Sequence, residues 1–396
     1  MAIESIIILV GAAYLVSLIA GSLMQKYLKI PWMFAALFFG IVLSALGWTA
    51  GIQSDSFQVL ANLGLLIILF LIGFNLDLTE IIKLKRYVAL GTVGIIIGEG
   101  LAVSLLLYFF FPAFVNNSFV VALVVATSFA TVGEAVLLPI LKEFKVLDTK
   151  FGQLTLGIGT FDDIIELATL VAVVLLPFAA AHSKALPSLE PVAYGIAAII
   201  ALSALFLLLR KVFLSVLKKS REAYVHFLVV ISAFFVFVTA SYLTFPELAP
   251  IAVIVAGALS RHCLPPKVLK DGARDIDFLG YVFFAPLFFL SVGGEVSLDA
   301  LSLSPLLVLA LVTVALGAKL LASFALFRKL LGTKYSLLMG VGLSVRFSTS
   351  LVVQYILLSE GLISAQLFSA LIATAVILKP VIIGVYSWGL SKGRPP

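Results

Sequence analysis

The chain has 396 residues, of which 62% are hydrophobic and only 12% are charged, with a net charge of +6. About one quarter of the residues of soluble globular proteins are charged, so this composition excludes a soluble enzyme and a disordered chain. Because Cys263 is the single cysteine, the chain is also neither a disulfide scaffold nor a protein with a cysteine-based metal cluster. The basic excess is typical of the cytoplasmic loops of a membrane protein, so no nucleic-acid partner is expected.

Apolar runs broken by polar turns predict thirteen transmembrane helices, because a helix crosses a bilayer with about 20 apolar residues. The first run is interpreted as a membrane span rather than as a cleavable signal peptide. The expected fold class is an all-α polytopic membrane protein. The predicted spans, in chain order, are 4–21, 29–48, 57–76, 87–112, 117–141, 151–177, 191–217, 223–245, 247–262, 278–296, 300–327, 335–359 and 363–388.

The distribution of basic residues predicts the orientation of the chain. Of the 26 lysines and arginines, 22 lie in the loops after the odd-numbered helices or in the C-terminal tail, whereas the opposite loops carry Lys184 alone. Cytoplasmic loops are the ones enriched in Lys and Arg. We therefore expect a multi-pass protein of the cell (inner) membrane with its N-terminus outside and its C-terminus in the cytoplasm.

Helices 1–6 and 8–13 form two sets of six on either side of helix 7, and the two sets enter the membrane from opposite sides. Inverted repeats of this kind are typical of secondary transporters. In each set the fifth helix carries a polar interruption near mid-span, at 127–134 and at 344–350. We interpret both as broken crossing helices. The alternative is two intact helices whose hydroxyl groups bond back to the carbonyl of residue i−4.

Two charged residues suit the ends of the expected half-helices. Glu134 follows the first interruption, near the N-terminus of a half-helix, where a negative charge is favourable. Arg346 lies near the C-terminus of the half-helix before the second interruption, where a cation is favourable. We therefore expect both residues to take part in charge pairing at the breaks.

Helix 151–177 contains two adjacent acids, Asp162 and Asp163, about 18 Å from its cytoplasmic end and thus close to the bilayer midplane. Adjacent helical residues point about 100° apart, so one aspartate can face a neighbouring helix while the other faces a cavity. Lys319 lies at a similar depth, and a Lys–Asp pair would keep both groups ionised. The alternative is a buried ion pair that only fixes helix packing.

The second aspartate would then be free to bind a small cation with oxygen ligands from the first broken helix. The candidate ligands are the hydroxyl groups of Thr127, Ser128 and Thr131. Protonation of the carboxylate removes the charge that attracts the cation. Competition between H⁺ and a monovalent cation for one carboxylate is the basis of antiport.

Other ionisable residues also lie within or beside the predicted spans, where such groups mark ion or substrate paths by default. Glu166, one turn beyond the aspartates, either extends a proton path or is a protonated helix contact. Glu99, between two glycines, is interpreted as closing a helix–helix contact. Lys379 is interpreted as a snorkelling or packing residue near the inner end, and Glu295 as a solvated helix end rather than a guard of an outer funnel.

Several short segments match an ordered series of family motifs. They are Lys29–Pro31 with Gly40–Leu43, Phe70–Leu78, Ala126–Ser128, Phe161–Asp163, Ala249–Ile251, Ala285–Phe289 with Val292–Gly293, Gly317–Lys319 and Gly342–Arg346. In this order, over nearly the whole chain, they resemble the cation:proton antiporter 2 family, particularly its NapA-like sodium/proton members.

The resemblance implies roles for the site residues. Asp163 would bind the cation and the proton, Asp162 would pair with Lys319, and Thr127 and Ser128 would lie in the first crossover. Family members with a double aspartate and a lysine are generally electrogenic. The chain departs from the family pattern at Arg346, where the usual Arg-Gly-Glu reads Arg-Phe-Ser, so an acidic partner for Arg346 is missing and Glu134 is a candidate to replace it.

The resemblance also implies a fold of the NhaA/NapA type that works by an elevator-like movement. A dimerisation domain would comprise 1–85 and 223–298, a moving core domain 86–180 and 299–396, and a linker helix 181–222. The expected protein is a homodimer in membrane lipid. It would exchange Na⁺ or K⁺ for H⁺ in pH homeostasis, with no enzymatic activity and no cofactor.

Two alternatives on the same scaffold remain open at this point. One is a potassium-efflux channel or transport pathway, which Lys319 and the lack of a nucleotide-binding domain after the last helix count against. The other is a sodium-coupled organic-anion symporter, which the two acids of the sixth helix disfavour because they offer no anion-binding surface.

Overall fold

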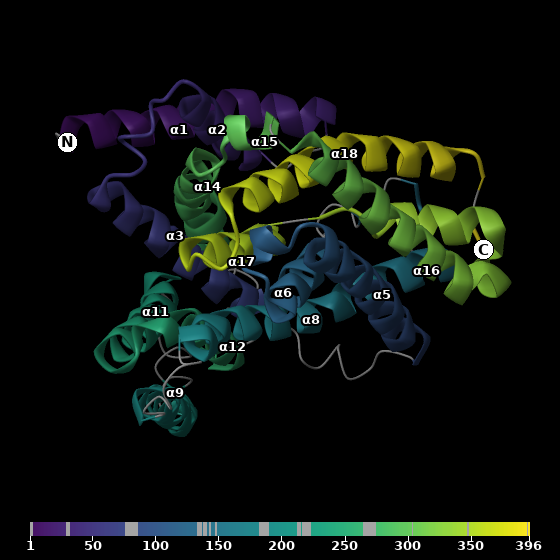
Figure 1. Cartoon of the computed structure of the whole chain (residues 1–396). Coiled ribbons are helices and arrows are strands. Elements are labelled where there is room, and N and C mark those ends of the chain that lie inside the picture. The colour runs from purple at the N-terminus through teal and green to yellow at the C-terminus, as the bar shows by residue number, and fades with distance from the viewer. Residues whose placement is uncertain are drawn as a thin grey trace. The chain divides into compact units, whose positions relative to one another are not determined.

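The computed structural model is helical throughout its regular elements (Figure 1). Six helices in the part of the chain that it describes are long and apolar enough to cross a membrane, and shorter apolar helices accompany them. The predicted all-helical architecture is therefore confirmed. The structure describes residues 3–28, 32–75, 86–132, 137, 141, 144–146, 149–181, 190–211, 215, 223–263, 275–302, 304–346, 348–393 and 395–396.

The chain divides into two compact units, each assembled from separate stretches of sequence. Unit 1 comprises 1–20, 33–77 and 178–294, and unit 2 comprises 21–32, 78–177 and 295–396. The helices of unit 1 are α1 (Ile3–Leu23, whose last turn falls in unit 2), α2 (Phe34–Ala45), α3 (Asp55–Asn75), α9 (Glu190–Leu208), α11 (Ala223–Thr244), α12 (Ala249–Cys263) and α14 (Ala285–Gly294), with short helices η3 (Pro246–Leu248) and η4 (Phe278–Phe284).

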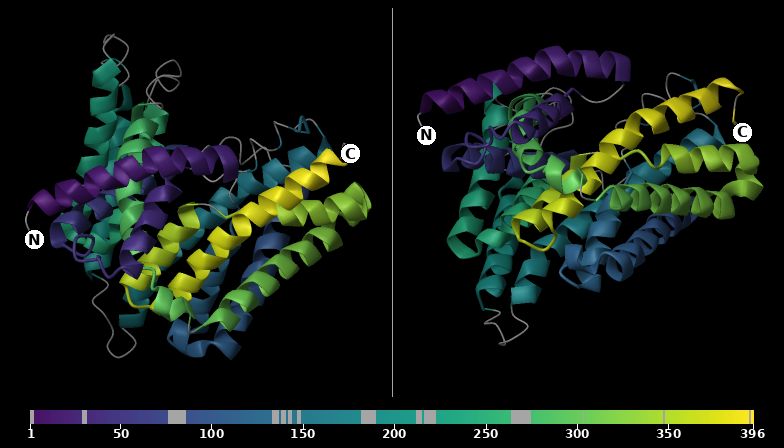
Figure 2. Two further views of the ribbon diagram at one scale, coloured as in Figure 1. Left: turned by 90° about the horizontal axis from the view of Figure 1, so that it is seen from above. Right: turned by 45° about the horizontal axis from the view of Figure 1, so that its top comes forward.

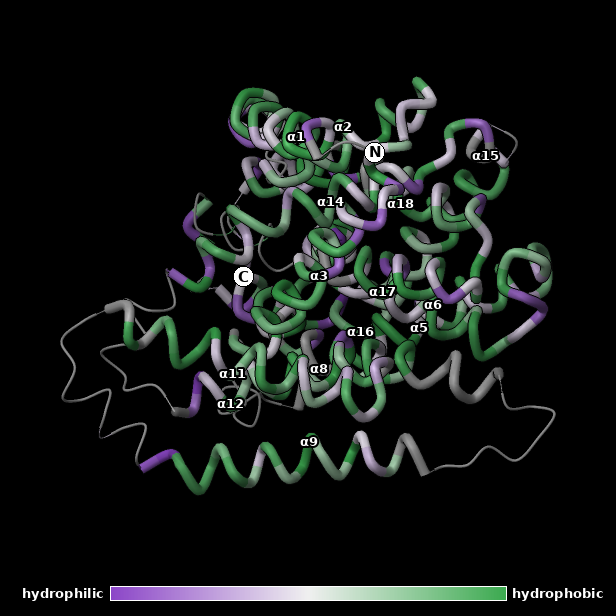
Figure 3. Tube along the Cα trace, turned by 90° about the vertical axis from the view of Figure 1, so that its left-hand side faces the viewer, coloured by the Kyte–Doolittle hydropathy of each residue, from purple (hydrophilic) through white to green (hydrophobic). Residues whose placement is uncertain are grey.

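Unit 1 is held together by helices that approach each other at glycine. A methyl group added at Gly257 of α12 would collide with the Phe70 carbonyl of α3, and one added at Gly293 of α14 would collide with the Leu37 carbonyl of α2. Small residues at such crossings allow the close backbone approach on which helix association in membranes depends. By contrast α9 is hydrophobic along most of its length (Figure 3) and contacts mainly α11 and α12.

Unit 2 contains the segments in which the sequence predicts the ion site. Its helices are η2 (Pro112–Val115), α5 (Arg86–Phe110), α6 (Phe119–Ala130), α8 (Lys150–Ala181, to Pro177), α15 (Leu298–Ser302), α16 (Pro305–Gly342), α17 (Ser348–Ser359) and α18 (Ala365–Ser391), with η1 (Met24–Leu28) also assigned to it. The helix α5 packs on α6 and α16, and α16 runs beside α18 (Figure 2).

Two helices of unit 2 stop where the sequence predicts interruptions. The helix α6 ends at Ala130, and the next residue, Thr131, is extended with ψ 159°. The helix α16 leaves helical geometry first at Gly332 (φ 77°, ψ 168°), a left-handed position that favours glycine, and ends at Gly342. The next helix, α17, starts at Ser348. The alternative of an intact second crossing helix is therefore wrong, and backbone groups at both breaks bond to side chains of other helices.

Candidate functional site

The site is built on α5, which brings a carboxylate between two other helices. Glycines on one face of α5 allow α16 to approach, and Gly100 on another face lies against Thr127 of α6. A β-carbon at any of these positions would be in contact with the neighbouring helix. The contacts facing α16 are Gly91 with Phe327, Gly94 with Leu326, and Gly98 with Ala322.

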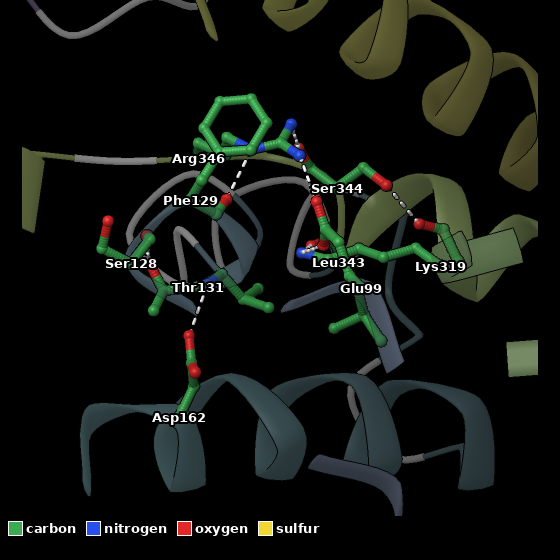
Figure 4. Close-up of polar contacts among 11 residues, drawn as sticks. Glu99, Ser128, Phe129, Thr131, Asp162, Lys319, Leu343, Ser344 and Arg346 are labelled. Carbon is green, nitrogen blue, oxygen red and sulfur yellow. Dashed lines mark hydrogen bonds and ion pairs between the residues drawn. The ribbon is translucent and has the colours of Figure 1, made fainter. Parts of the chain in front are cut away.

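Glu99, which lies among these glycines, is completely buried and holds two cations (Figure 4). Its Oε2 atom lies 3.2 Å from Lys319 Nζ, and its Oε1 atom lies 2.5 Å from Arg346 Nη2. Both cations are themselves buried. An unpaired buried charge is strongly unfavourable, so the three side chains stabilise one another's ionised forms.

Arg346 joins the two interrupted helices. Its Nε donates to the Phe129 carbonyl near the end of α6 at 2.7 Å, and its Nη1 donates to the Ser344 carbonyl at 3.3 Å. The guanidinium also lies over the Phe129 ring, 3.8 Å from the centroid (Figure 4). The last carbonyls of a helix have no partner within that helix and carry partial negative charge. Arg346 therefore satisfies carbonyls from both breaks at once, consistent with its expected place near a half-helix C-terminus.

Lys319 on α16 reaches the second break. Its Nζ donates to the Leu343 carbonyl at 2.6 Å in addition to its ion pair with Glu99. The sequence-based prediction that Asp162 is the ion-pair partner of Lys319 needs correction, because the carboxylate in contact with Lys319 is that of Glu99. Asp162 attracts Lys319 electrostatically without supplying that contact. The predicted lack of an acidic partner for Arg346 is also wrong, since Glu99 is that partner.

Asp162 on α8 serves the first break instead. Its buried carboxylate accepts a hydrogen bond through Oδ2 from the backbone N–H of Val132, two residues past the end of α6 (Figure 4). An acid therefore does meet a free backbone donor at this break, as was predicted for Glu134. Glu134 itself lies outside the described residues. Asp163 belongs to α8, and its side chain lies outside the part of the chain that the structure describes.

The three predicted hydroxyl ligands lie at the end of α6. Thr127 donates to Leu123 O at 2.7 Å, Ser128 to Val125 O at 2.8 Å, and Thr131 to Ser128 O at 2.9 Å. Each hydroxyl hydrogen is therefore used on a carbonyl of α6, but only Thr127 bonds to the carbonyl of residue i−4, and α6 ends at Ala130 rather than continuing intact. The oxygen lone pairs keep acceptor capacity, so these groups can still serve as cation ligands.

The structure also describes three further charged residues that the sequence analysis singles out. Glu166 is half-buried on α8, one turn beyond Asp162. Lys379 is buried within α18 rather than placed at its end. Glu295 is half-buried just past α14, and its burial raises its pKa above the ordinary value, so the helix end at which it lies is only partly solvated.

The charges of the described site balance. Glu99 and Asp162 contribute two negative charges, and Lys319 and Arg346 contribute two positive charges, all buried in unit 2. The described cluster is therefore neutral as a whole, and the next residue along α8 is Asp163.

An all-helical membrane unit in which buried acids and bases meet at interrupted helices defines a secondary transporter of the cation:proton antiporter class. The chain belongs to the transmembrane sodium/hydrogen exchanger family, whose model matches residues 14–387. It is 26% identical to a Na⁺/H⁺ antiporter of Enterococcus hirae, over 94% of this chain and 96% of that protein. It is 25% identical to the Na⁺/H⁺-K⁺ antiporter GerN of Bacillus cereus, over 91% of this chain and 89% of that protein.

A solved structure has the same fold. The sodium proton antiporter MjNhaP1 from Methanocaldococcus jannaschii, at pH 8, matches with a TM-score of 0.60 at 18% identity, over 98% of this chain and 95% of that one. The resemblance to cation:proton antiporters is therefore confirmed, and the chain is a multi-pass membrane protein.

Sequence reasoning missed the central position of Glu99. A signal for it was present, because an acid flanked by glycines in a membrane helix places charge where neighbouring backbones come closest. The prediction that Glu99 closes a helix–helix contact is confirmed, but the two ion pairs through which it makes that contact were not predicted.

Proposed function

We propose that the protein is a secondary active antiporter that exchanges Na⁺ or K⁺ for H⁺ at Asp163. The observation that carries this proposal is the charge balance of the described site, in which Glu99 and Asp162 offset Lys319 and Arg346, so that the Asp163 carboxylate is not needed to neutralise either cation. A monovalent cation and a proton each restore neutrality there. They exclude each other, because each neutralises the charge that attracts the other.

In this proposal the breaks supply the remaining ligands. The hydroxyl oxygens of Thr127, Ser128 and Thr131 stand at the end of α6, next to the segment that Asp162 binds through Val132. Carboxylate and hydroxyl oxygens replace part of the hydration shell of a hard cation. Transport by this route involves no catalytic residue and no cofactor. Glu166 is proposed as a step on the proton path.

We further propose the finer architecture that the sequence predicts: thirteen transmembrane helices in two inverted sets of six, and a homodimer with elevator-type alternating access. The division of the chain into units drawn from alternating stretches supports this proposal. Unit 1 draws on the stretches predicted for dimerisation and on the linker helix, and unit 2 draws on the stretches predicted for the core. The proposed setting is the inner membrane, with the N-terminus outside, in pH homeostasis.

Electrogenic exchange is proposed because Lys319 can change its charge within the cluster, whereas Arg346 stays charged at all relevant pH values. More than one proton can then move for each cation. The ion is left as Na⁺ or K⁺, and the similarity to the Na⁺/H⁺-K⁺ antiporter GerN supports testing the two ions side by side.

The test is solid-supported-membrane electrophysiology on proteoliposomes given Na⁺, K⁺ and Li⁺ in turn. We expect cation-driven proton movement that Asp163→Asn abolishes and that Asp299→Asn, a matched change at an exposed acid, leaves intact. Full exchange by Asp163→Asn would refute the mechanism. K⁺ currents without proton movement would favour the channel, and currents that require an organic anion would favour the symporter.

A further inference from the structure

The Glu99 carboxylate is shared by two cations that could otherwise face the aspartate pair. It contacts Lys319 through one oxygen and Arg346 through the other, and it has no solvent exposure. In the described part of the chain no other carboxylate forms an ion pair with either cation. Both cations therefore share one buried acid, which comes from a helix that carries neither the breaks nor the aspartates.

The geometry of α5 keeps this carboxylate in place. Gly98 and Gly100 allow α16 and α6 to approach on either side of Glu99. Lys319 projects from α16 and is drawn toward the Leu343 carbonyl at the second break. Arg346 is held by two carbonyls, those of Phe129 and Ser344. Of the two cations, Lys319 therefore has fewer hydrogen bonds to the backbone.

Lys319 is attracted by two acids. Glu99 forms the direct ion pair, and Asp162 adds an electrostatic attraction from α8. Of the two cations, only the lysine ammonium can lose its proton at moderate pH. The Glu99 carboxylate opposes the loss of that proton and holds the Lys319 ammonium at the second break, where it also donates to the Leu343 carbonyl.

We propose that Glu99 is a positioning residue for antiport, which holds Lys319 charged and in place and thereby sets the pH range over which the aspartates exchange a cation for protons. The proposal rests on the proposed function and assigns it a further residue. The charged groups that face Glu99 in the described structure are Lys319 of α16 and Arg346 of the second break, and Asp162 of α8 also attracts Lys319 electrostatically.

Removal of the Glu99 carboxylate should shift the pH dependence of transport in one direction. With a neutral side chain at position 99, every titratable group in the cluster experiences more positive potential, so its proton-poor form is favoured. An opposite charge within about 4–6 Å shifts a titration by roughly one to three units. We therefore expect Glu99→Gln to move the pH of half-maximal transport toward lower pH by about one unit.

The experiment measures two pH profiles in the full chain: Na⁺-driven current in proteoliposomes, and the rise in melting temperature that saturating Na⁺ produces in detergent. Glu99→Asp keeps the charge on a shorter side chain, and we expect a smaller shift than that of Glu99→Gln. Glu360→Gln removes an exposed acid of unit 2 and should leave both profiles unchanged. When Lys319→Gln is already present, adding Glu99→Gln should shift the pH profile by less than half as much as it does in the wild-type chain. The reason is that Lys319, the group on which Glu99 mainly acts, is then absent.

Three results would overturn the proposal: an unchanged pH profile in Glu99→Gln, a shift in Glu99→Asp as large as that in Glu99→Gln, or a full shift in the Lys319→Gln background. The melting-temperature profile reports on variants that bind Na⁺ without transporting it. Wild-type protein that moves no cation would instead refute the proposed function. If the wild-type protein exchanges a cation for protons but Glu99→Gln has the same pH profile as wild type, only the inference about Glu99 is refuted.

Discussion

Arg346 is the side chain that holds the two interrupted helices together, and Arg346→Lys isolates that role while keeping the charge. Arginine here reaches Glu99, the Phe129 carbonyl and the Ser344 carbonyl, and it also covers the Phe129 ring. Lysine has a single nitrogen on a flexible stem, so it can keep the ion pair with Glu99 but cannot reproduce the fork of the guanidinium.

The cost follows from the contacts that are lost. A hydrogen bond from a charged donor contributes about 1.5–3 kcal/mol. The bond to Phe129 at 2.7 Å is of full strength, and the bond to Ser344 at 3.3 Å is weaker. The cation–π contact, buried and 3.8 Å from the centroid, adds about 1–2 kcal/mol. Because lysine regains part of this in a new position, we expect a net loss of about 3 kcal/mol in the free energy of unfolding.

The assay is reversible unfolding of the purified protein in mixed micelles, followed by circular dichroism against the mole fraction of a denaturing detergent. Arg328→Lys is the matched control, because Arg328 also lies over a phenylalanine, Phe324, but is exposed to the surroundings. Its change should fall within about 0.5 kcal/mol of zero. Equal stability of Arg346→Lys and wild type, or an equal loss in both variants, would refute the role assigned to the guanidinium.

Two further predictions concern packing and pH. Gly257→Ala should weaken the α3–α12 contact and lower the melting temperature, because the new methyl group meets the Phe70 carbonyl, whereas Gly384→Ala, with open space around it, should be neutral or stabilising. A similar effect of the two changes would contradict the packing argument. Burial raises the pKa of Glu295, so the folded state binds this proton more tightly than the unfolded state and loses stability as the pH rises above the ordinary value. Glu295→Gln should therefore gain stability relative to wild type at pH 8 but not at pH 4, and thermal unfolding that shows the same difference at both values would refute this.

The helices themselves follow from local sequence. Hydropathy over a window of about 20 residues reports directly on whether a segment can lie in lipid, and the observed α1, α3 and α5 start and end within two residues of the predicted spans. The breaks also left a local signal. Hydroxyl residues, among them Thr131 and Ser344, stand where a continuous membrane helix would carry Leu or Val, and the helices stop beside them.

The two acids of α8 and the buried cations were likewise visible one by one, because an ionisable residue in an apolar run is costly enough to mark a site wherever it occurs. Sequence alone could therefore supply the fold class, the antiporter class and most members of the site. It could also place Asp162, Asp163 and Lys319 at a common depth, because depth in a helix follows from residue number.

Which acid contacts which base was decided only by the tertiary structure. Depth along a helix leaves its rotation and its neighbours open, and these depend on side-chain packing between segments far apart in the chain, here over 220 residues between Glu99 and Lys319. The glycines of α5 bring α16 close enough for Glu99 to hold both cations. Asp162 is left to the backbone of the first break. The sequence determined which charges enter the membrane, and the packing of α5 determined how they are paired.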